Sequence, residues 1–229
     1  MKEYPKLLAK DIIERAANLS STLLSDGMKE LGMVKYGCMD AGIAPVAPSM
    51  RVVGTAFTVD TDKGDNYPIH MATYSAPAPG YVMIIAGKGY AGNAYIGGLI
   101  VGAAQAVGYI GMVVDGYVRD YNDLLELGLP VFARGLIPAG PIKKEPGGFN
   151  IPVHCGGLQV SPGDLVVGDA DGVVVVPQSR IEEVFAKAEA KLAYEKNQVK
   201  KIAEYKAKKI AGDKLPHLAP QWVQDIING

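Results

Sequence analysis

The chain has 229 residues and a formal net charge of −1, with 48% hydrophobic and 21% charged residues. This composition is typical of a globular protein, and the length suits one large domain or a domain with appendages. Because the net charge is close to zero, no global field recruits nucleic acid or an anionic membrane, and we expect neither as a partner.

The cysteines and the N-terminal segment bear on the cellular compartment. Cys38 and Cys155 lack metal-type spacing and are too few for a disulfide framework, so we expect buried or incidental thiols. Residues 1–11 are charged and lack the apolar core of a signal peptide. We therefore expect a cytoplasmic location.

Periodicity and turn residues predict the elements of the first part of the chain. Apolar residues recur at helical spacing after Pro5, and a Ser/Thr cap and Gly32 bound the next helical pattern. A β-branched run and a continuous apolar run, YVMIIA, indicate strands. The predicted elements are helices over 6–19, 20–31 and 66–75, the last starting near Pro68, and strands over 51–60 and 81–86.

Residues 89–114 carry no charged side chain, and this stretch is long enough for a membrane span. Seven glycines and a change of pattern near Gly108 favour a buried helix followed by a buried strand instead. The elements predicted here and just beyond are a helix over 96–107, a strand over 111–115, a helix over 120–127 that ends at Gly128, and a strand over 130–133.

The last third of the chain begins with a long loop over 135–152 that is rich in proline and glycine. Long loops in compact domains are usually functional or interfacial. Turn residues separate three short strands, which we expect to form an antiparallel meander. These strands are predicted over 158–160, 164–168 and 173–176. A long charged helix over 179–209 and a tail over 212–229 follow, with Trp222 and Ile226-Ile227 as anchors of the tail.

The segment from Gly92 to Asp120 carries the most chemistry. The pair Gly97-Gly98 precedes a helical run, and a glycine-rich turn that enters a helix presents free N–H groups and a positive dipole to an anion. The following strand ends in Arg119-Asp120, which offers a carboxylate clamp beside a ligand for a hard metal. The structural alternative is that Asp115-Gly116 is only a turn and Asp120 only an N-cap.

Three motifs in this order resemble the RraA-like family. They are GGLIVGAAQAVGYIGMVVDGYVRD, LGLPVFARGLIPAGP and VHCGGLQVSPGDLVVGDADGVVVVP, with weaker matches at LLSDGM and RVVGTAFTV. The resemblance covers roughly residues 21–177. The family includes the class II 4-hydroxy-4-methyl-2-oxoglutarate/4-carboxy-4-hydroxy-2-oxoadipate aldolases and the regulator of ribonuclease E activity.

The resemblance implies an α/β protein with the β/β/α swivelling-domain-like fold, N-terminal helices and a long C-terminal helix. We expect a single RraA-like domain over 1–229, with a core over 21–177 and a C-terminal helix and tail over 179–229. It further implies a homotrimer or homohexamer whose active site lies between subunits, and a small 2-oxo acid as substrate.

The resemblance also assigns roles to residues. Mg²⁺ or Mn²⁺ would be bound mainly through waters and Asp120, and Arg119 would pair with a carboxylate or enolate oxygen of the substrate. Gly97 and Gly98 precede the amides of Leu99 and Ile100, which would hold the substrate carboxylate. Glu195, from a neighbouring subunit, is the candidate for completing the metal shell, and a surface helix glutamate is the alternative interpretation.

One position departs from the aldolases of this family. They carry an acidic residue directly before the leucine that corresponds to Leu99, and this chain has Gly98 there. In the family that acid holds a metal-bound water and helps to deprotonate the substrate hydroxyl. Asn93 and His70 could orient a water instead, although each is more simply a structural polar residue. We therefore expect retro-aldol cleavage to suffer more than oxaloacetate decarboxylation.

The resemblance thus implies a metal-dependent pyruvate aldolase or oxaloacetate decarboxylase-like lyase. The alternative is a non-catalytic regulatory protein like the ribonuclease E regulator, which acts by protein contact. A quinone methyltransferase finds little support, because no glycine-rich nucleotide loop with a following acidic residue comes after a first strand.

Overall fold

A mixed sheet forms the centre of the computed structural model, which describes residues 4–75, 79–145 and 147–228. The strand order is β1-β6-β5-β3-β2-β10-β11, with β4 on β5 and β7 on β2. The strands are β1 (Ala44–Pro45), β2 (Val52–Asp60), β3 (Tyr81–Ala86), β4 (Ala94–Ile96), β5 (Gly111–Val118), β6 (Val131–Leu136), β7 (Gly148–Phe149), β10 (Leu165–Asp169) and β11 (Gly172–Val176). Strands β2, β3, β5 and β6 run parallel, whereas β10 and β11 pair antiparallel.

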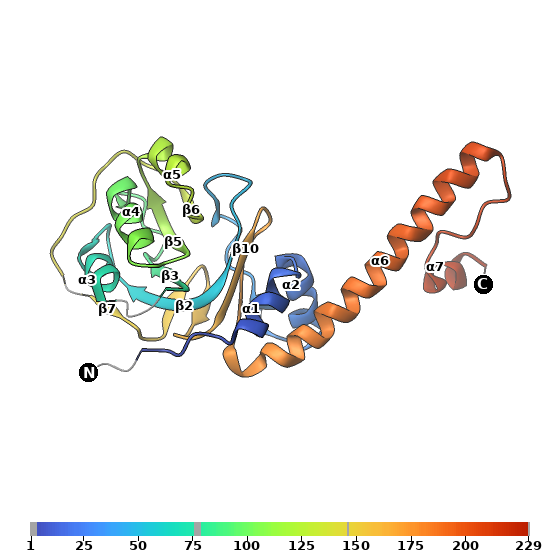
Figure 1. Ribbon diagram of the computed structural model, residues 1–229, viewed down its shortest axis with the longest axis horizontal. Coiled ribbons are helices and arrows are strands. Elements are labelled where there is room, and N and C mark those ends of the chain that lie inside the picture. The colour runs from blue at the N-terminus through green and yellow to red at the C-terminus, as the bar shows by residue number, and fades with distance from the viewer. Residues whose placement is uncertain (1–3, 76–78, 146, 229) are drawn as a thin grey trace. The chain divides into compact units, whose positions relative to one another are not determined.

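Three short helices cover one face of this sheet, α3 (Tyr67–Ser75), α4 (Gly98–Ala106) and α5 (Tyr121–Leu127). They lie together on one side of the strands in Figure 1. Each is part of the connection between two parallel strands, as parallel pairing requires. Phe57 and Met83 from the strands pack with Ile69, Val101 and Leu124 from the helices in one buried cluster.

A separate hairpin covers the opposite face. It consists of β8 (Val153–Cys155) and β9 (Leu158–Val160), joined by two glycines at positive φ, Gly156 and Gly157. Its apolar side chains pack with those of β3, β5 and β6 in a second buried cluster. Hairpin, sheet and helices form three layers, so the α/β fold of β/β/α order expected from the resemblance is confirmed.

The expected three-stranded meander is wrong. Strand β9 pairs with β8, and β10 pairs with β11 and β2 instead. The local pattern identifies each strand but not its partner, because pairing depends on the register that the buried faces select.

The N-terminal segment forms α1 (Lys10–Ala17), α2 (Ser21–Glu30) and the short 3₁₀ turn η1 (Val34–Gly37). The capped second helix is confirmed, because the Ser20 side chain accepts the Leu23 N–H. The first helix is shorter than the predicted 6–19. The chain before it is extended against the sheet, where the Leu8 N–H donates to Thr55 Oγ1 and the Tyr81 hydroxyl donates to the Pro5 carbonyl.

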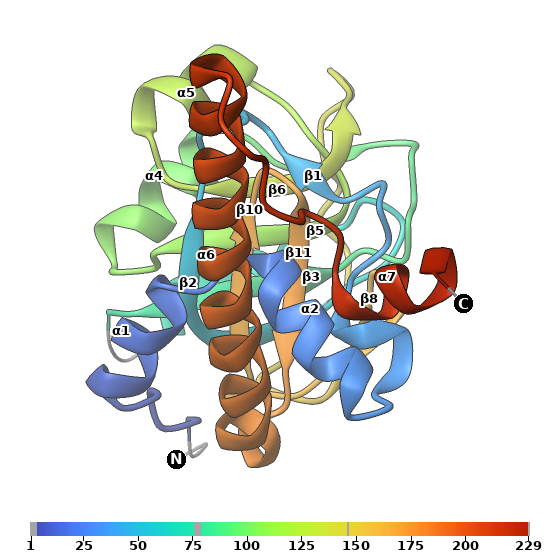
Figure 2. The ribbon, with the colours of Figure 1, turned by 90° about the vertical axis from the view of Figure 1, so that its right-hand side faces the viewer.

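The predicted long C-terminal helix is confirmed as α6 (Ile181–Ala211), which follows the 3₁₀ turn η2 (Gln178–Arg180), and Figure 2 shows it as one continuous helix. The chain divides into a unit over 1–188 and a unit over 189–229. A last helix, α7 (Gln221–Asn228), carries the expected anchors of the tail. Trp222, Ile226 and Ile227 are 66%, 72% and 74% exposed there, so they do not pack within the second unit, and a role as anchors stays a prediction.

The uncharged stretch 89–114 forms β4, α4 and the first half of β5. This confirms a buried helix followed by a buried strand, with one short extra strand. Of the helices that the structure describes, none has both the length and the apolar character that a membrane span needs. A single domain over 1–229 and a cytoplasmic location stay predictions.

A chain of ion pairs runs from the hairpin turn through the sheet. Asp115 is 5% exposed and accepts hydrogen bonds from Arg134 Nε at 2.5 Å and from the Gly156 N–H at 2.9 Å. Arg134 Nη2 also donates to Asp40 Oδ2 at 3.0 Å, and Lys35 Nζ lies 2.6 Å from Asp40 Oδ1. The Lys35 ammonium and the Arg134 guanidinium hold the pKa of Asp40 below its ordinary value. Cys38 and Cys155 are free thiols, and burial raises the pKa of Cys155.

We expect Arg134→Met to lower the free energy of unfolding by about 3 kcal/mol, because it leaves the Asp115 carboxylate buried without its cation. Lys35→Met is the control: its pair with Asp40 is solvent-exposed, and its loss costs below about 1 kcal/mol. Urea unfolding at neutral pH measures both. Equal effects of the two substitutions would contradict a structural role specific to the buried pair.

Candidate active site

The pairing of β4 with β5 brings two distant parts of the sequence together. Ala94 lies in register with Tyr117, and Ile96 with Val118. The Arg119 N–H then donates to the Ile96 carbonyl at 3.0 Å. The end of β5 therefore lies beside the start of α4, so that Arg119 and Asp120 meet the glycine pair as the sequence suggested.

Position 97 has no room for a side chain, because Arg119 and Asp120 lie directly against it. Gly97 has a φ of −154°, which is extended backbone that any residue can adopt. A Cβ at this position would collide with the Asp120 carboxylate and would lie 2.9 Å from Arg119 Cγ. The lack of a side chain at Gly97 thus permits the close approach of the two segments.

Asp120 takes a strained conformation at this junction. It lies in the left-handed region, with φ 60° and ψ 47°, which few residues other than glycine adopt readily. It occupies the N-cap position of α5 but makes no capping hydrogen bond. Its Oδ2 instead accepts the Gly98 N–H at 3.1 Å. The two structural alternatives from the sequence therefore fail: Asp120 is not a simple cap, and Asp115-Gly116 lies inside β5 rather than in a turn.

Arg119 has a hydrogen-bond donor without an acceptor. Its Nε is buried and finds no hydrogen-bond partner within the described chain, and the nearest charged atom, Asp120 Oδ2, is 3.6 Å away. That distance is too long for a hydrogen bond. On the other side the guanidinium lies against Gly140, where a Cβ would be 2.9 Å from Nη1. A buried unsatisfied donor is costly, and a ligand oxygen would remove that cost.

The loop over 137–142 lies against the Arg119 guanidinium and is held in place by residues at and just before the start of β4. The Ala94 N–H donates to the Ala139 carbonyl at 2.8 Å, and Asn93 Nδ2 donates to the Gly140 carbonyl at 2.5 Å. Asn93 is therefore a structural polar residue that fixes the loop. His70 lies on α3, where burial and the nearby charge of Lys143 lower its pKa.

The first turn of α4 supplies further donors. The first N–H groups of a helix have no partner within it, and here the Gly98 N–H goes to Asp120 and the Val101 N–H to the Gly97 carbonyl. The amides of Leu99 and Ile100 complete the turn. The Leu99 side chain is 92% exposed, so this end of the helix opens to solvent. A carboxylate is the kind of group that such a helix start binds.

A cavity of about 490 Å³ adjoins this helix start. It is lined by Gly98, Leu99, Gln105, Asp123, Glu126 and Leu127. Asp123 is absent from the residues expected from the sequence. Its spacing of three residues from Asp120 places it on the same side of α5 and is the signal that could have found it.

The metal ligands expected from the resemblance are not gathered in one place. Asp120 lies at the site, and Glu195 is an exposed residue of α6 in the second unit. Within the described ranges no three or more His, Cys, Asp and Glu side chains form a cluster that could hold a metal ion. A role for Glu195 in a neighbouring subunit stays a prediction.

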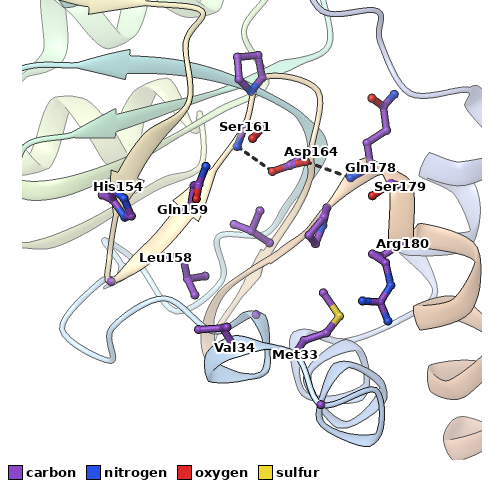
Figure 3. Close-up of a pocket in the computed structure, with 16 residues that line it drawn as sticks. Met33, Val34, His154, Leu158, Gln159, Ser161, Asp164, Gln178, Ser179 and Arg180 are labelled. Carbon is purple, nitrogen blue, oxygen red and sulfur yellow. Dashed lines mark hydrogen bonds between the residues drawn. The ribbon is translucent and has the colours of Figure 1, made fainter.

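Another cavity, of about 900 Å³, lies between the β8–β9 hairpin, η1 and η2 (Figure 3). Its buried carboxylate, Asp164, accepts the Ser161 N–H at 2.8 Å and the Gln178 N–H at 3.0 Å, and burial raises its pKa. Arg180 on its rim already pairs with Glu183. Because these charged groups have partners, this cavity lacks the unsatisfied donor found at Arg119.

Comparison with known proteins points to one family. A sequence model of the RraA-like family, described as Aldolase/RraA, matches residues 21–175. A Halalkalibacterium halodurans protein named "Putative 4-hydroxy-4-methyl-2-oxoglutarate aldolase" is 37% identical over 85% of this chain and 90% of its own length.

Two crystal structures are similar in fold. Streptomyces coelicolor RraAS2, described as an unusual member of the RNase ES inhibitor RraA protein family, has a TM-score of 0.74 and 29% identity over 82% of this chain and 96% of its own. An uncharacterized protein from Pseudomonas syringae has a TM-score of 0.74 and 28% identity over 88% of this chain and 96% of its own.

We expect Gly97→Ala to lower the free energy of unfolding by about 1–3 kcal/mol, because the added methyl group has no room beside Asp120. Gly102→Ala in the same helix is the control. A Cβ there meets only Leu127 at ordinary contact distance, so the better helix propensity of alanine gives a change between zero and about 1 kcal/mol of stabilisation. Urea titration separates the two; equal stability of both variants would show that Gly97 is not sterically required.

Proposed function

The chain belongs to the RraA-like family, and from this premise we propose that it is a divalent-metal-dependent carbon–carbon lyase. It releases pyruvate from a 4-hydroxy-2-oxo acid by retro-aldol cleavage, decarboxylates oxaloacetate, or does both. Arg119 and Asp120 are its catalytic residues, and Gly97, Gly98, Leu99 and Ile100 form the rest of the substrate site.

The observation that carries this proposal is the unsatisfied Nε of Arg119. It lies beside an exposed carboxylate, Asp120, and a helix start with amides at Leu99 and Ile100. A 2-oxo acid brings complementary groups: a carboxylate for the helix start and a keto oxygen for the guanidinium. Arginine is suited to planar oxygen groups because its donors form a fixed fork.

The residues present fit a cation held by one carboxylate and water. The Asp120 side chain is 37% exposed, and its hydrogen bond from Gly98 uses Oδ2, leaving Oδ1 open. Mg²⁺ prefers oxygen ligands and keeps several of its waters, often with only one or two protein carboxylates. When bound, Mg²⁺ or Mn²⁺ would withdraw electrons from the keto group of the substrate.

The protein groups explain how the bond between carbons 3 and 4 breaks. Negative charge develops on the keto oxygen as the pyruvate enolate forms, and the Arg119 guanidinium stabilises it. The amides of Leu99 and Ile100 hold the 1-carboxylate and so fix the orientation of the bond to be cleaved. When carbon dioxide leaves, no base is needed. When a ketone leaves, a base must first take the hydroxyl proton.

The proposed metal site requires more than one subunit, because its second carboxylate would come from a neighbouring copy of the chain. We propose a homotrimer or homohexamer in which Glu195 of one subunit approaches Asp120 of another. Hard cations of this kind accept a second carboxylate readily. Mn²⁺ affinity of Glu195→Gln, measured by titration with electron paramagnetic resonance, tests this role.

The second candidate function is a non-catalytic regulatory role through protein contact. The similarity to RraAS2, which is described within an RNase ES inhibitor family, favours it. A stoichiometric protein partner in pull-down, with no turnover of any 2-oxo acid, would support this role over the lyase.

The decisive assay is pyruvate release coupled to lactate dehydrogenase, from oxaloacetate and from 4-hydroxy-4-methyl-2-oxoglutarate. Mg²⁺, Mn²⁺ and EDTA are compared, with a blank that contains metal without protein. We expect turnover with metal and none with EDTA. Turnover of neither substrate would contradict the lyase.

We expect Asp120→Asn to lower kcat/KM for pyruvate release by about 10²-fold or more, because it removes the charged metal ligand. Asparagine tolerates the left-handed backbone and keeps an oxygen for the Gly98 N–H, so the fold should persist. Steady-state kinetics and Mn²⁺ titration measure the effect, and circular dichroism checks the fold. Activity within threefold of the parent protein would remove Asp120 from the site.

A further inference from the structure

We propose that Asp123 is the general base of the retro-aldol reaction: its carboxylate takes the proton of the substrate hydroxyl, directly or through one water. This inference rests on the proposed function and identifies the proton acceptor that the residues named there do not include. The sites derived above stabilise the enolate and hold the carboxylate, but none of their groups accepts the hydroxyl proton.

The position of Asp123 depends on the glycine at position 98. A Cβ built on Gly98 would lie 2.7 Å from Asp123 Oδ2 and 2.8 Å from Asp123 Cβ. The carboxylate of Asp123 therefore occupies the space into which a side chain at position 98 would extend. A residue on α5 thus presents an acid at the start of α4.

Two carboxylates converge on Gly98 from one helix. Asp120 Oδ2 accepts its N–H, and the Asp123 side chain lies within 3 Å of the place where a Cβ of residue 98 would stand. The two acids are three residues apart, which places them on one side of the first turn of α5. Asp123 is consequently next to the metal ligand, yet its own side chain is not used to hold the backbone.

Asp123 is also free to react. It is exposed and lines the cavity of about 490 Å³ together with Gly98 and Leu99. Over the described residues, it has neither an ion pair nor a hydrogen bond. Its carboxylate is therefore not used by a structural partner in the described chain, and substrate or water can approach it.

The proposed step balances without a further reactant. Asp123 takes the proton of the hydroxyl on carbon 4, and the carbon–oxygen bond becomes the carbonyl of the leaving ketone. The bond between carbons 3 and 4 breaks, and its electron pair passes to the keto group, which gives the pyruvate enolate beside Arg119. Protonation of the enolate at carbon 3 returns one proton and yields pyruvate.

A purely structural role makes a different prediction. Asp123 is an acid in the first turn of α5, where a carboxylate stabilises the helix dipole by about 0.3–1 kcal/mol. Its loss would then change stability slightly and both reactions equally. Glu126 lines the same cavity, but the three atoms nearest to a Cβ built on Gly98 all belong to Asp123. Glu126→Gln is therefore the matched control.

The first test compares Asp123→Asn with Glu126→Gln. For 4-hydroxy-4-methyl-2-oxoglutarate we expect kcat of Asp123→Asn to fall by about 10²-fold or more with KM little changed, as for loss of a general base. Oxaloacetate decarboxylation and Mn²⁺ affinity should stay within about threefold, because neither needs this base. The acidic limb of the kcat–pH profile should also disappear. Glu126→Gln should change none of these.

The second test moves the carboxylate. Asp123→Gly should lose retro-aldol activity, and Gly98→Asp combined with Asp123→Gly should regain about tenfold or more of it, since glycine removes the Cβ at position 123 and the acid returns to the same space from α4. Gly98→Asp alone should not increase activity, because the two side chains would collide. A folded double variant no more active than Asp123→Gly overturns the proposal.

The outcomes separate this proposal from the proposed function. If the parent protein cleaves the hydroxy acid and Asp123→Asn keeps its kcat, or loses both activities equally, Asp123 is not the base while the lyase stands. If the parent protein only decarboxylates oxaloacetate, Asp123 is again excluded. Turnover of neither substrate overturns the lyase and the role of Asp123 with it.

Discussion

The absence of a side chain at Gly97 is the constraint on which the candidate site depends. Because nothing projects from this residue, the turn after β5 lies directly against the start of α4. The contact places the carboxylate of Asp120 on the Gly98 N–H and forces Asp120 into a left-handed conformation. Such strain is characteristic of functional sites, where surrounding structure holds a residue in a costly geometry.

Two arginines, one on β6 and one directly after β5, differ in whether their donors find partners within the described chain. Arg134 extends from β6 to Asp115 and Asp40, and so connects the sheet with the loop after η1; Asp115 in turn accepts the Gly156 N–H of the hairpin turn. Arg119 lies at the end of β5, and its Nε has no acceptor in the described chain. A satisfied buried guanidinium fixes the fold, whereas an unsatisfied one is prepared for a ligand oxygen.

The two proposed reactions differ in the groups that they require, because one releases carbon dioxide and the other a ketone. In the proposed reaction, enolate formation requires positive charge and oriented donors, which Arg119 and the first turn of α4 would provide. Release of a ketone also requires a proton acceptor. The glycine at position 98 leaves space for an acid, and Asp123 from α5 fills it. Under our proposal, the role that the resemblance assigns to an acid at position 98 would be served by a residue 25 positions later in the chain.

Elements that depend on local pattern could be predicted from the amino-acid sequence alone. The apolar run of β3, the cap at Ser20 and the stop of α5 at Gly128 were all readable, because period and turn residues act over a few neighbours. The Arg119-Asp120 motif was readable for the same reason. The pairing of β9 with β8 rather than β10, and the position of Asp123 against Gly98, are visible in the fold alone. Both features are contacts between segments whose partners are chosen by packing and register, which no local pattern encodes.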